Sequence, residues 1–266
     1  MPEGHTIHRL ARDHQKWFAG SRPRSRSPQG RFDDGAAAID RTELHAVEAH
    51  GKHLFYRFAA GRTIHVHLGL YGKHTTHRCG LTDAPDPRET CRWRLSGRGR
   101  TVDLVGPTAC ELLDETGVGK IRSRLGPDPA RDDADPEPLF ETLGRSRSPI
   151  GVALMDQSKF AGVGNIFRAE ALWWARLHPR TPSRDVDREL LEAVWDRLRE
   201  WFATAIRGRY IVTREREELD VPPSRLRRGE RLNIYKQPGC RRCGAEPTSA
   251  KMAGRTVWWC PRCQGR

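Results

Sequence analysis

The spacing of apolar side chains predicts that the chain begins with one helix and continues as β-structure. Residues 4–18 carry apolar side chains at helical spacing with charges between them, which predicts an amphipathic helix (Ile7, Leu10, Ala11 and Phe18). From residue 43 onward the pattern alternates. The segments HLFYRFAAGRTIHVHL and CRWRLSGRGRTVDLV each predict two strands joined at a turn that contains Gly and Arg. Roughly the first 120 residues are therefore expected to be rich in strands.

The pattern becomes helical after residues 124–138, where clustered prolines and aspartates predict a linker or domain boundary. The segments PIGVALMDQ and GNIFRAEALWWARL predict helices on either side of a turn of small residues at 161–164. Residues 185–209 predict one long helix, because apolar side chains recur at steps of three and four (Leu190, Leu191, Val194, Leu198, Trp201 and Phe202). The charged stretch 214–231 predicts a mobile loop.

The charge balance favours a polyanionic partner. A formal net charge of +13 points first to nucleic acid and second to an anionic membrane surface. An arginine-rich composition is a plainer explanation, because only seven of the 47 basic residues are Lys. The chain has no apolar run long enough to span a membrane and no signal-peptide core near its start. Its cysteine pattern is unlike a secreted disulfide framework, so we expect a cytoplasmic protein.

Two CxxC pairs near the end of the chain predict a structural zinc site. Cys240 and Cys243 are followed after sixteen residues by Cys260 and Cys263, a spacing that supplies four thiolates to one tetrahedral Zn²⁺. Four protein ligands close the site, which favours a structural over a catalytic ion. The intervening segment KMAGRTVWWC predicts a β-hairpin. Five nearby cations predict a nucleic-acid surface, or else ordinary solvated charge (Arg241, Arg242, Lys251, Arg255 and Arg262).

The first residues suggest a reactive amine. Pro2 follows the initiator Met, and removal of Met1 would leave a free secondary amine. Because an α-amine has a pKa near 8, a sizeable fraction is neutral and nucleophilic at neutral pH. Such an amine can attack C1′ of a deoxyribose and form an iminium ion, while the neighbouring Glu3 transfers protons. Many proteins begin in this way, so the motif gains meaning only from the rest of the chain.

Five ordered segments supply that context. They are MPEGHTIHRLA at the start, GKHLF at 51–55, HLGLYG at 67–72, MDQSKFAGVGNIFRAEAL at 155–172 and the four-cysteine ribbon. Together they resemble the formamidopyrimidine-DNA glycosylase / endonuclease VIII family, most closely endonuclease VIII of the actinobacterial type. The resemblance implies an α+β multidomain fold with three parts. These are an N-terminal β-sandwich catalytic domain with flanking helices at 1–125, a helix-two-turns-helix DNA-binding domain at 126–228 and a four-cysteine zinc finger at 229–266.

The resemblance also implies an activity. The protein is expected to be a bifunctional DNA glycosylase and AP lyase of base excision repair. It would remove oxidised bases, mainly pyrimidines and hydantoins, through an N-terminal proline Schiff base, and then cleave the strand by β,δ-elimination. Its partner would be damaged double-stranded DNA, and it would need one structural Zn²⁺ but no catalytic metal or redox cofactor. We expect a monomer, because a random lesion offers no symmetric half-sites.

Four residues match the family's catalytic positions. Pro2 matches the nucleophile and Glu3 matches the general acid/base. Lys52 matches a lysine that contacts phosphate near the lesion, although it is also plausible as a plain surface residue. Arg255 matches the zinc-finger arginine that holds the phosphates flanking the flipped nucleotide.

Four further residues match DNA-binding positions. Asn165 matches the asparagine of the helix-two-turns-helix, where exposed N–H groups of a helix start suit a phosphate. Its alternative role is N-capping of that helix. Leu70 and Tyr71 match the last two positions of a group that fills the gap left by a flipped base, and their alternative is a buried strand end. His67 contacts phosphate or else packs within its strand.

The chain departs from the family pattern at two places. His5 and Thr6 replace a second Pro-Glu pair, and Gly69 stands where endonuclease VIII commonly has a larger polar residue. These departures bear on lesion specificity rather than on the basic chemistry. Three alternatives remain open: a formamidopyrimidine/8-oxoguanine glycosylase, a non-enzymatic zinc-finger DNA-binding protein, and a zinc-ribbon RNA-binding or transcription factor.

Overall fold

The computed structural model describes residues 2–80 and 82–265. These residues form two compact units. The first contains Pro2 and residues 7–124, and the second contains residues 3–6 and 125–265. Within the described residues, no helix is both long enough and apolar enough to cross a membrane.

The first unit is built from two antiparallel sheets and the helix α1 (Gly4–Phe18), whose residues from Ile7 onward belong to it. One sheet has the strand order β1-β6-β7-β5, and the other has the order β2-β3-β4-β8. The strands are β1 (Arg24–Arg26), β2 (Leu44–His50), β3 (His53–Phe58), β4 (Thr63–His67), β5 (Lys73–His77), β6 (Cys91–Gly97), β7 (Arg100–Val105) and β8 (Ala109–Leu113). The short helices α2 (Asp33–Ile39) and α3 (Glu115–Arg122) flank them. Both predicted hairpins are confirmed, as β3–β4 and β6–β7.

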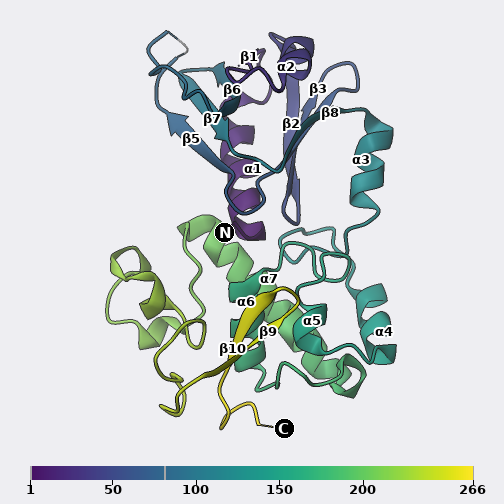
Figure 1. Ribbon diagram of the computed structural model, residues 1–266, viewed down its shortest axis with the longest axis vertical. Coiled ribbons are helices and arrows are strands. Elements are labelled where there is room, and N and C mark those ends of the chain that lie inside the picture. The colour runs from purple at the N-terminus through teal and green to yellow at the C-terminus, as the bar shows by residue number, and fades with distance from the viewer. Residues whose placement is uncertain (1, 81, 266) are drawn as a thin grey trace. The chain divides into compact units, whose positions relative to one another are not determined.

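The facing sides of the two sheets form one apolar core with α1. Successive residues of a strand point to opposite faces, and Leu54, Val66 and Leu95 are among those buried in this core. Figure 1 shows α1 between the two sheets, and ring contacts link its His14 to Tyr56 of one sheet and to His74 of the other. The predicted β-sandwich with an N-terminal helix is therefore confirmed.

A buried polar pair fixes α1 against the sandwich. His14 Nδ1 and the Tyr56 hydroxyl form a hydrogen bond of 2.6 Å, and both side chains are fully buried. Burial lowers the pKa of His14 to about 3 and raises the pKa of Tyr56 well above its ordinary value. The pair is therefore neutral in the folded protein. It anchors the middle of the helix whose first residues follow Pro2 and Glu3.

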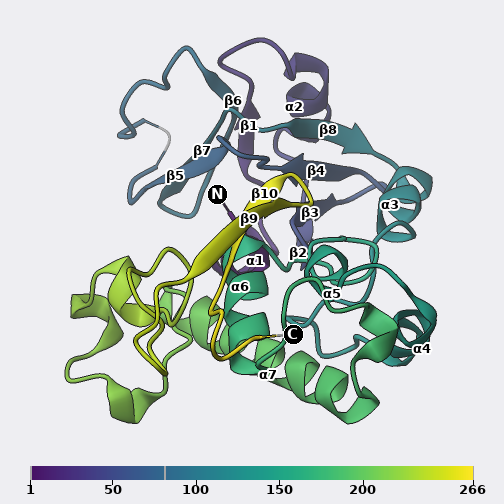
Figure 2. The same cartoon turned by 60° about the horizontal axis from the view of Figure 1, so that its bottom comes forward.

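The second unit is helical and ends in a hairpin. Its α-helices are α4 (Glu137–Arg145), α5 (Ile150–Ala153), α6 (Asn165–Trp174) and α7 (Arg188–Gly208). The predicted long helix is thus confirmed as α7, and it packs on α6 through Phe202 and Phe167, whose rings stack at 4.3 Å. The predicted hairpin is confirmed as β9 (Thr248–Met252) and β10 (Arg255–Trp259), which lie beside α6 (Figure 2). A 3₁₀ turn, η1 (Ser183–Asp185), precedes α7.

Two segments are more ordered than their sequence pattern predicted. The boundary at 124–138 is irregular only up to Pro136, because α4 begins at Glu137 with a proline in its first turn, where no N–H is lost. The stretch 214–231 contains three 3₁₀ helices, η2 (Arg216–Glu218), η3 (Pro223–Arg225) and η4 (Arg228–Arg231). The Arg214 guanidinium ties this stretch together by donating to the carbonyl oxygens of Glu218 and Glu230. Such turns need no apolar periodicity, so the pattern did not predict them.

Replacing the His14 pair is expected to flatten the acid side of the stability curve. The folded protein keeps this imidazole neutral, whereas the unfolded chain binds a proton below the ordinary pKa of 6.5. The contribution is full above pH 6.5 and is lost as the pH falls toward 3, at up to about 1.4 kcal/mol per pH unit. Urea unfolding of His14→Leu/Tyr56→Phe should therefore show a pH slope that is smaller by about one proton.

The matched control for this prediction is His45→Gln, at an exposed position of β2. It should keep the wild-type slope of the free energy of unfolding against pH. An unchanged slope in the double variant, measured over the same acid range, would contradict the assignment of a neutral buried His14.

Candidate functional site

Glu3 is buried against the start of α6. Its side chain is 1% exposed, and its carboxylate accepts hydrogen bonds from the backbone N–H groups of Ile166 (2.9 Å) and Phe167 (3.4 Å). Gly164 makes this approach possible, because a Cβ at that position would lie 2.3 Å from Glu3 Cδ. The small residues predicted to permit close backbone approach therefore admit the segment that directly follows Pro2.

This contact corrects the prediction made for the start of α6. The N–H groups of Ile166 and Phe167 were expected to be exposed to a phosphate, but the Glu3 carboxylate occupies both. A carboxylate satisfies the positive end of the helix dipole as a phosphate would. The alternative of N-capping by Asn165 is also wrong, because Gly164 is the N-cap residue and Asn165 is the first residue of the helix.

Asn165 connects α6 to the strand that begins with Arg255. Its amide Nδ2 donates to the Thr256 carbonyl oxygen at 2.8 Å, and its Oδ1 accepts from the Arg168 guanidinium. The residue next to Arg255 is thereby held by the helix-two-turns-helix. Among the residues that the structure describes, none forms a hydrogen bond or ion pair with the half-buried Arg255 guanidinium.

Two charged residues of α6 that the sequence analysis did not assign organise the same region. Arg168 is fully buried, and it donates to the carbonyl oxygens of Gly151 (3.2 Å) and Met252 (3.1 Å) as well as to Asn165. Burial lowers the pKa of Arg168 to about 10, and the nearby Glu3 acts in the opposite direction. The guanidinium therefore links α5, α6 and the hairpin in a single contact.

Glu170 plays the matching role toward the segment before the zinc finger. Its buried carboxylate accepts from the backbone N–H groups of residues 233, 234 and 235 at 2.8–2.9 Å and from the Thr213 hydroxyl at 2.5 Å. The available signal was the pair of opposite charges in FRAEAL, inside a helix that is apolar on both sides. Charges at such positions are retained only with partners.

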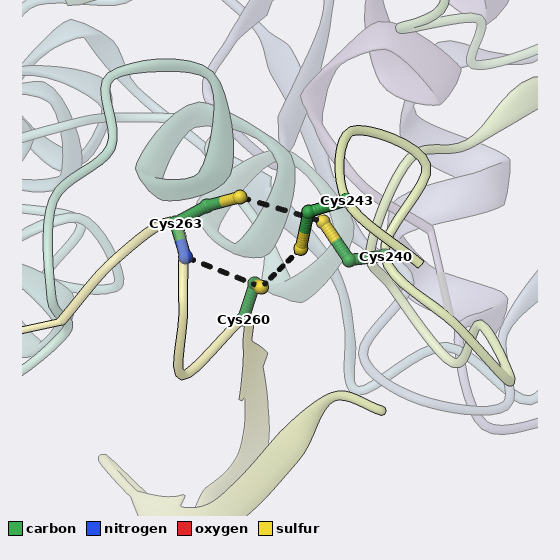
Figure 3. Close-up of side chains that lie close together, drawn as sticks. All are labelled: Cys240, Cys243, Cys260 and Cys263. Carbon is green, nitrogen blue, oxygen red and sulfur yellow. Dashed lines mark hydrogen bonds between the residues drawn. The ribbon is translucent and has the colours of Figure 1, made fainter. Parts of the chain in front are cut away.

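The four predicted zinc ligands converge. All four Sγ atoms lie within 4.8 Å of one another, with Cys240–Cys263 at 4.0 Å and Cys243–Cys260 at 3.4 Å (Figure 3). Tetrahedral Zn–S bonds of about 2.3 Å put sulfurs about 3.8 Å apart, so the spacing fits this ion. Burial raises the pKa of the Cys240 thiol, but N–H donors that include the Trp173 indole outweigh it and lower the pKa to about 7. This cluster is a site that can hold a metal ion.

The cysteine knuckles are fixed to the end of α6. The Trp173 indole N–H donates to Cys240 Sγ at 3.1 Å, and Gln264 bridges the Cys260 N–H and the Leu177 carbonyl oxygen, both at 2.8 Å. Arg242 was predicted to belong to a nucleic-acid surface. Its guanidinium donates to the Trp173 carbonyl oxygen and lies 4.1 Å from the centre of that ring, so it stabilises the C-terminal end of the helix, and the nucleic-acid role stays a prediction.

In the first unit, Lys52 lies near His67. Lys52 lies in the turn between β2 and β3, and His67 ends β4 opposite His53. Burial lowers the pKa of His67, and the nearby His65 and Lys52 lower it further. The proximity of a permanent cation therefore favours a neutral imidazole.

Leu70 and Tyr71 are exposed at the turn between β4 and β5. Tyr71 is 85% exposed and Leu70 is 43% exposed, so the alternative of a buried strand end is wrong. Gly69 has a φ of +64°, and a Cβ there would lie 1.9 Å from Thr108 Oγ1. A larger residue at position 69 would therefore be strained by this φ and would have to displace the Thr108 side chain. His5, the other departure, packs edge-on against Phe167 at 5.6 Å.

Three features together define a DNA repair glycosylase. They are a β-sandwich preceded by an N-terminal proline, a helix-two-turns-helix, and a hairpin with four cysteines. Residues 1–108 match the formamidopyrimidine-DNA glycosylase N-terminal domain, and residues 125–216 match the formamidopyrimidine-DNA glycosylase H2TH domain. The chain belongs to the formamidopyrimidine-DNA glycosylase / endonuclease VIII family, whose members are DNA glycosylases with AP lyase activity.

Individual relatives agree with this assignment. The chain is 43% identical over 269 residues to Endonuclease 8 1 of Mycobacterium tuberculosis, with 99% of this chain and 100% of the relative covered. It is 31% identical to a formamidopyrimidine-DNA glycosylase of Thermomicrobium roseum, with 86% and 84% covered. Its fold resembles that of Lactococcus lactis Fpg in complex with DNA containing an abasic site, with a TM-score of 0.81, 23% identity and coverage of 99% and 100%.

Glu3→Gln is expected to destabilise the protein although Glu3 lies at the candidate catalytic position. The substitution removes a negative charge and one of two acceptors from the start of α6, which should lower the free energy of unfolding by about 1 kcal/mol. Urea unfolding at neutral pH measures this loss. Glu189→Gln, in the exposed first turn of α7, is the matched control and should cost less than about 0.5 kcal/mol. Equal losses in the two variants would contradict the proposed anchoring.

Proposed function

We propose that this protein removes oxidised pyrimidines and hydantoins from duplex DNA and then cleaves the strand by β,δ-elimination, with Pro2 as the nucleophile. The observation that carries the proposal is the buried Glu3 carboxylate, held by two N–H donors immediately after Pro2. Two converging donors favour an ionised carboxylate, which can accept a proton from the neighbouring amine. The chemistry requires removal of Met1, which lies outside the described residues.

In the first half of the proposed reaction, the Pro2 nitrogen replaces the base at C1′ of the deoxyribose. The lone pair of the Pro2 nitrogen forms a bond to C1′, while the bond from C1′ to the base breaks and its electron pair leaves with the base, which takes up a proton from water. Glu3 accepts the proton that the amine loses and passes it to O4′. The C1′–O4′ bond then opens, and an iminium ion joins Pro2 to the sugar.

The second half uses that iminium as an electron sink. Loss of a proton from C2′ expels the 3′ phosphate and breaks the strand, and a further elimination expels the 5′ phosphate. The surrounding phosphates would be held by four side chains, Lys52, His67, Asn165 and Arg255. The cationic side chains would act through their charge, and the others through an N–H group. The Arg255 guanidinium, which has no hydrogen-bond partner among the described residues, and the second N–H of the Asn165 amide are suited to this role.

The exposed turn supports the choice of lesion class. A leucine and a tyrosine that project into solvent can fill the space left by a flipped base and stack on its neighbours. We propose that Leu70 and Tyr71 form this wedge alone, because position 69 carries no side chain and its positive φ favours glycine. The 43% identity to a relative named Endonuclease 8 1 favours oxidised pyrimidines.

A second candidate is a formamidopyrimidine/8-oxoguanine specificity. It is favoured by the Thermomicrobium roseum relative, which is named a formamidopyrimidine-DNA glycosylase. The division at 1–125, 126–228 and 229–266 and the monomeric state remain part of the proposal. So does Zn²⁺ as the ion of the four-cysteine site, where it would hold the two knuckles together and take no part in the reaction.

Borohydride trapping should detect the Schiff base. Protein whose N-terminus has been checked by mass spectrometry is incubated with duplexes that carry thymine glycol, dihydrouracil, 8-oxoguanine or an abasic site. We expect a covalent adduct with the wild type, fastest with the pyrimidine lesions and the abasic site. Pro2→Gly should reduce it at least about tenfold on the base lesions, because a primary amine replaces the proline nitrogen.

Protein that retains Met1 is the control, since its Pro2 nitrogen is an amide and cannot attack. A wild-type protein that lacks Met1 and binds the duplexes but gives no adduct would overturn the enzymatic proposal in favour of a DNA-binding protein. A preference for 8-oxoguanine would favour the second candidate.

Removal of two of the four cysteines should cost both metal and DNA binding. Purified wild type is expected to contain about one zinc per chain, and Cys260→Ser/Cys263→Ser about none, by atomic absorption. DNA binding should weaken about tenfold or more, because the hairpin that carries Arg255 is no longer fixed. Cys79→Ser, outside the cluster, is the control. Full zinc content in the double variant would contradict the ligand set.

A further inference from the structure

The sheet β2-β3-β4-β8 has a second face, away from the apolar core, that carries a row of imidazoles. His53 pairs with His67 across β3 and β4, and His65 of β4 pairs with Glu111 of β8. Residues two apart on one strand share a face, so His53, His65 and His67 lie on the same side. The opposite side of these strands carries Leu54, Tyr56 and Val66 of the core.

Hydrogen bonds order this row. His65 Nδ1 lies 2.8 Å from Glu111 Oε1, and His65 Nε2 lies 2.8 Å from His53 Nδ1. A carboxylate only accepts, so His65 must carry its hydrogen on Nδ1 and offer a lone pair at Nε2. His53 must then donate from its own Nδ1. The Glu111 carboxylate, half exposed at the end of the row, therefore selects one tautomer for two buried or half-buried rings.

The row ends against His67 and Lys52. The His53 ring stacks on His65 at 5.1 Å and lies 4.8 Å from the His67 ring. Burial, neighbouring imidazoles that include His50, and Arg124 lower the pKa of His53 to about 3. Burial and Arg124 also lower the pKa of His65, although Glu111 acts against them.

We propose that Glu111, His65 and His53 form a positioning chain that holds His67 beside Lys52 as a neutral hydrogen-bond donor to a DNA phosphate. The inference rests on the proposed function, in which Lys52 and His67 contact the phosphates near the lesion. The chain fixes the plane of His53, and the His53 ring in turn limits the rotation of His67. His67 thus recognises a phosphate oxygen through an N–H group, while Lys52 supplies the charge.

Packing alone does not explain this arrangement. An apolar ring is accommodated on this face, because Phe55 packs against both His53 and His65, with ring centres at 6.5 and 5.3 Å. A buried imidazole costs free energy unless its nitrogens have partners. Here the hydrogen-bond donors and acceptors from Glu111 to His53 can be matched in one arrangement only. Such an arrangement is typical of side chains that orient a functional group.

The tautomers are measured directly by long-range ¹⁵N–¹H correlation NMR of protein labelled in the histidine rings. His53 and His65 are expected as neutral Nδ1–H tautomers at neutral pH. Glu111→Leu should return His65 toward the Nε2–H form that free histidine prefers. Nε2–H tautomers of both rings in the wild type would contradict the proposed positioning chain. This measurement uses no DNA, so it stands apart from the proposed function.

The functional part is tested with a double-mutant cycle on a duplex that carries an uncleavable abasic-site analogue. Glu111→Leu and His67→Ala are each expected to weaken binding about three- to tenfold, the worth of one hydrogen bond. In the His67→Ala background, Glu111→Leu should have no further effect. Glu111→Gln should rescue binding, because its amide oxygen accepts the same hydrogen bond. Additive losses would overturn the positioning role.

Salt dependence separates the hydrogen bond from the charge. Lys52→Ala should reduce the slope of log Kd against log salt by about 0.9, whereas His67→Ala and Glu111→Leu should leave the slope unchanged. Glu115→Leu, at a more exposed glutamate of the same unit, is the matched control and should bind like the wild type. A smaller slope in His67→Ala would mean a charged imidazole and would overturn the proposal. Failure of borohydride trapping in the wild type would overturn the enzymatic function. The tautomer measurement would still show whether the positioning chain from Glu111 to His53 exists.

Discussion

The second unit depends on the burial of charged side chains around one short helix, α6. Arg168 and Glu170 are fully buried within it, and Glu3 is buried against its start. Removing such groups from water costs several kcal/mol unless they are paired and hydrogen-bonded. Each therefore has to bind a particular piece of backbone, and these contacts hold the segments next to Pro2, the hairpin and the four-cysteine cluster.

The consequences for the site follow directly. The Glu3 carboxylate fixes the residue after the nucleophile, and the Asn165 amide fixes the residue after Arg255. Glu170 holds residues 233–235 ahead of the zinc finger. Positions that are distant in the chain are thus set from one helix, without any of them being rigid by local sequence. A helix start that resembled a phosphate site is instead part of the enzyme's own framework.

The two faces of the sheet β2-β3-β4-β8 differ in what holds their side chains in place. The inner face of β3 and β4 is apolar and holds α1 through the neutral pair of His14 and Tyr56. The outer face carries the row from Glu111 to His67, where hydrogen-bond order rather than apolar burial decides the geometry. Because successive residues of a strand point in opposite directions, the same short segments supply both faces.

The sequence by itself determined what depends on local order along the chain. It determined the helix at 4–18, the three hairpins, the long helix α7, the four-cysteine cluster and the family. Periodicity and ligand spacing are local properties, so they could be predicted. Only the tertiary structure decided what the polar groups bind, as for Glu3 and Ile166, which are 163 positions apart, and for Asn165 and Thr256, which are 91 apart. Hydrogen-bond partners of buried groups are chosen by packing across the fold, and no local pattern encodes that choice.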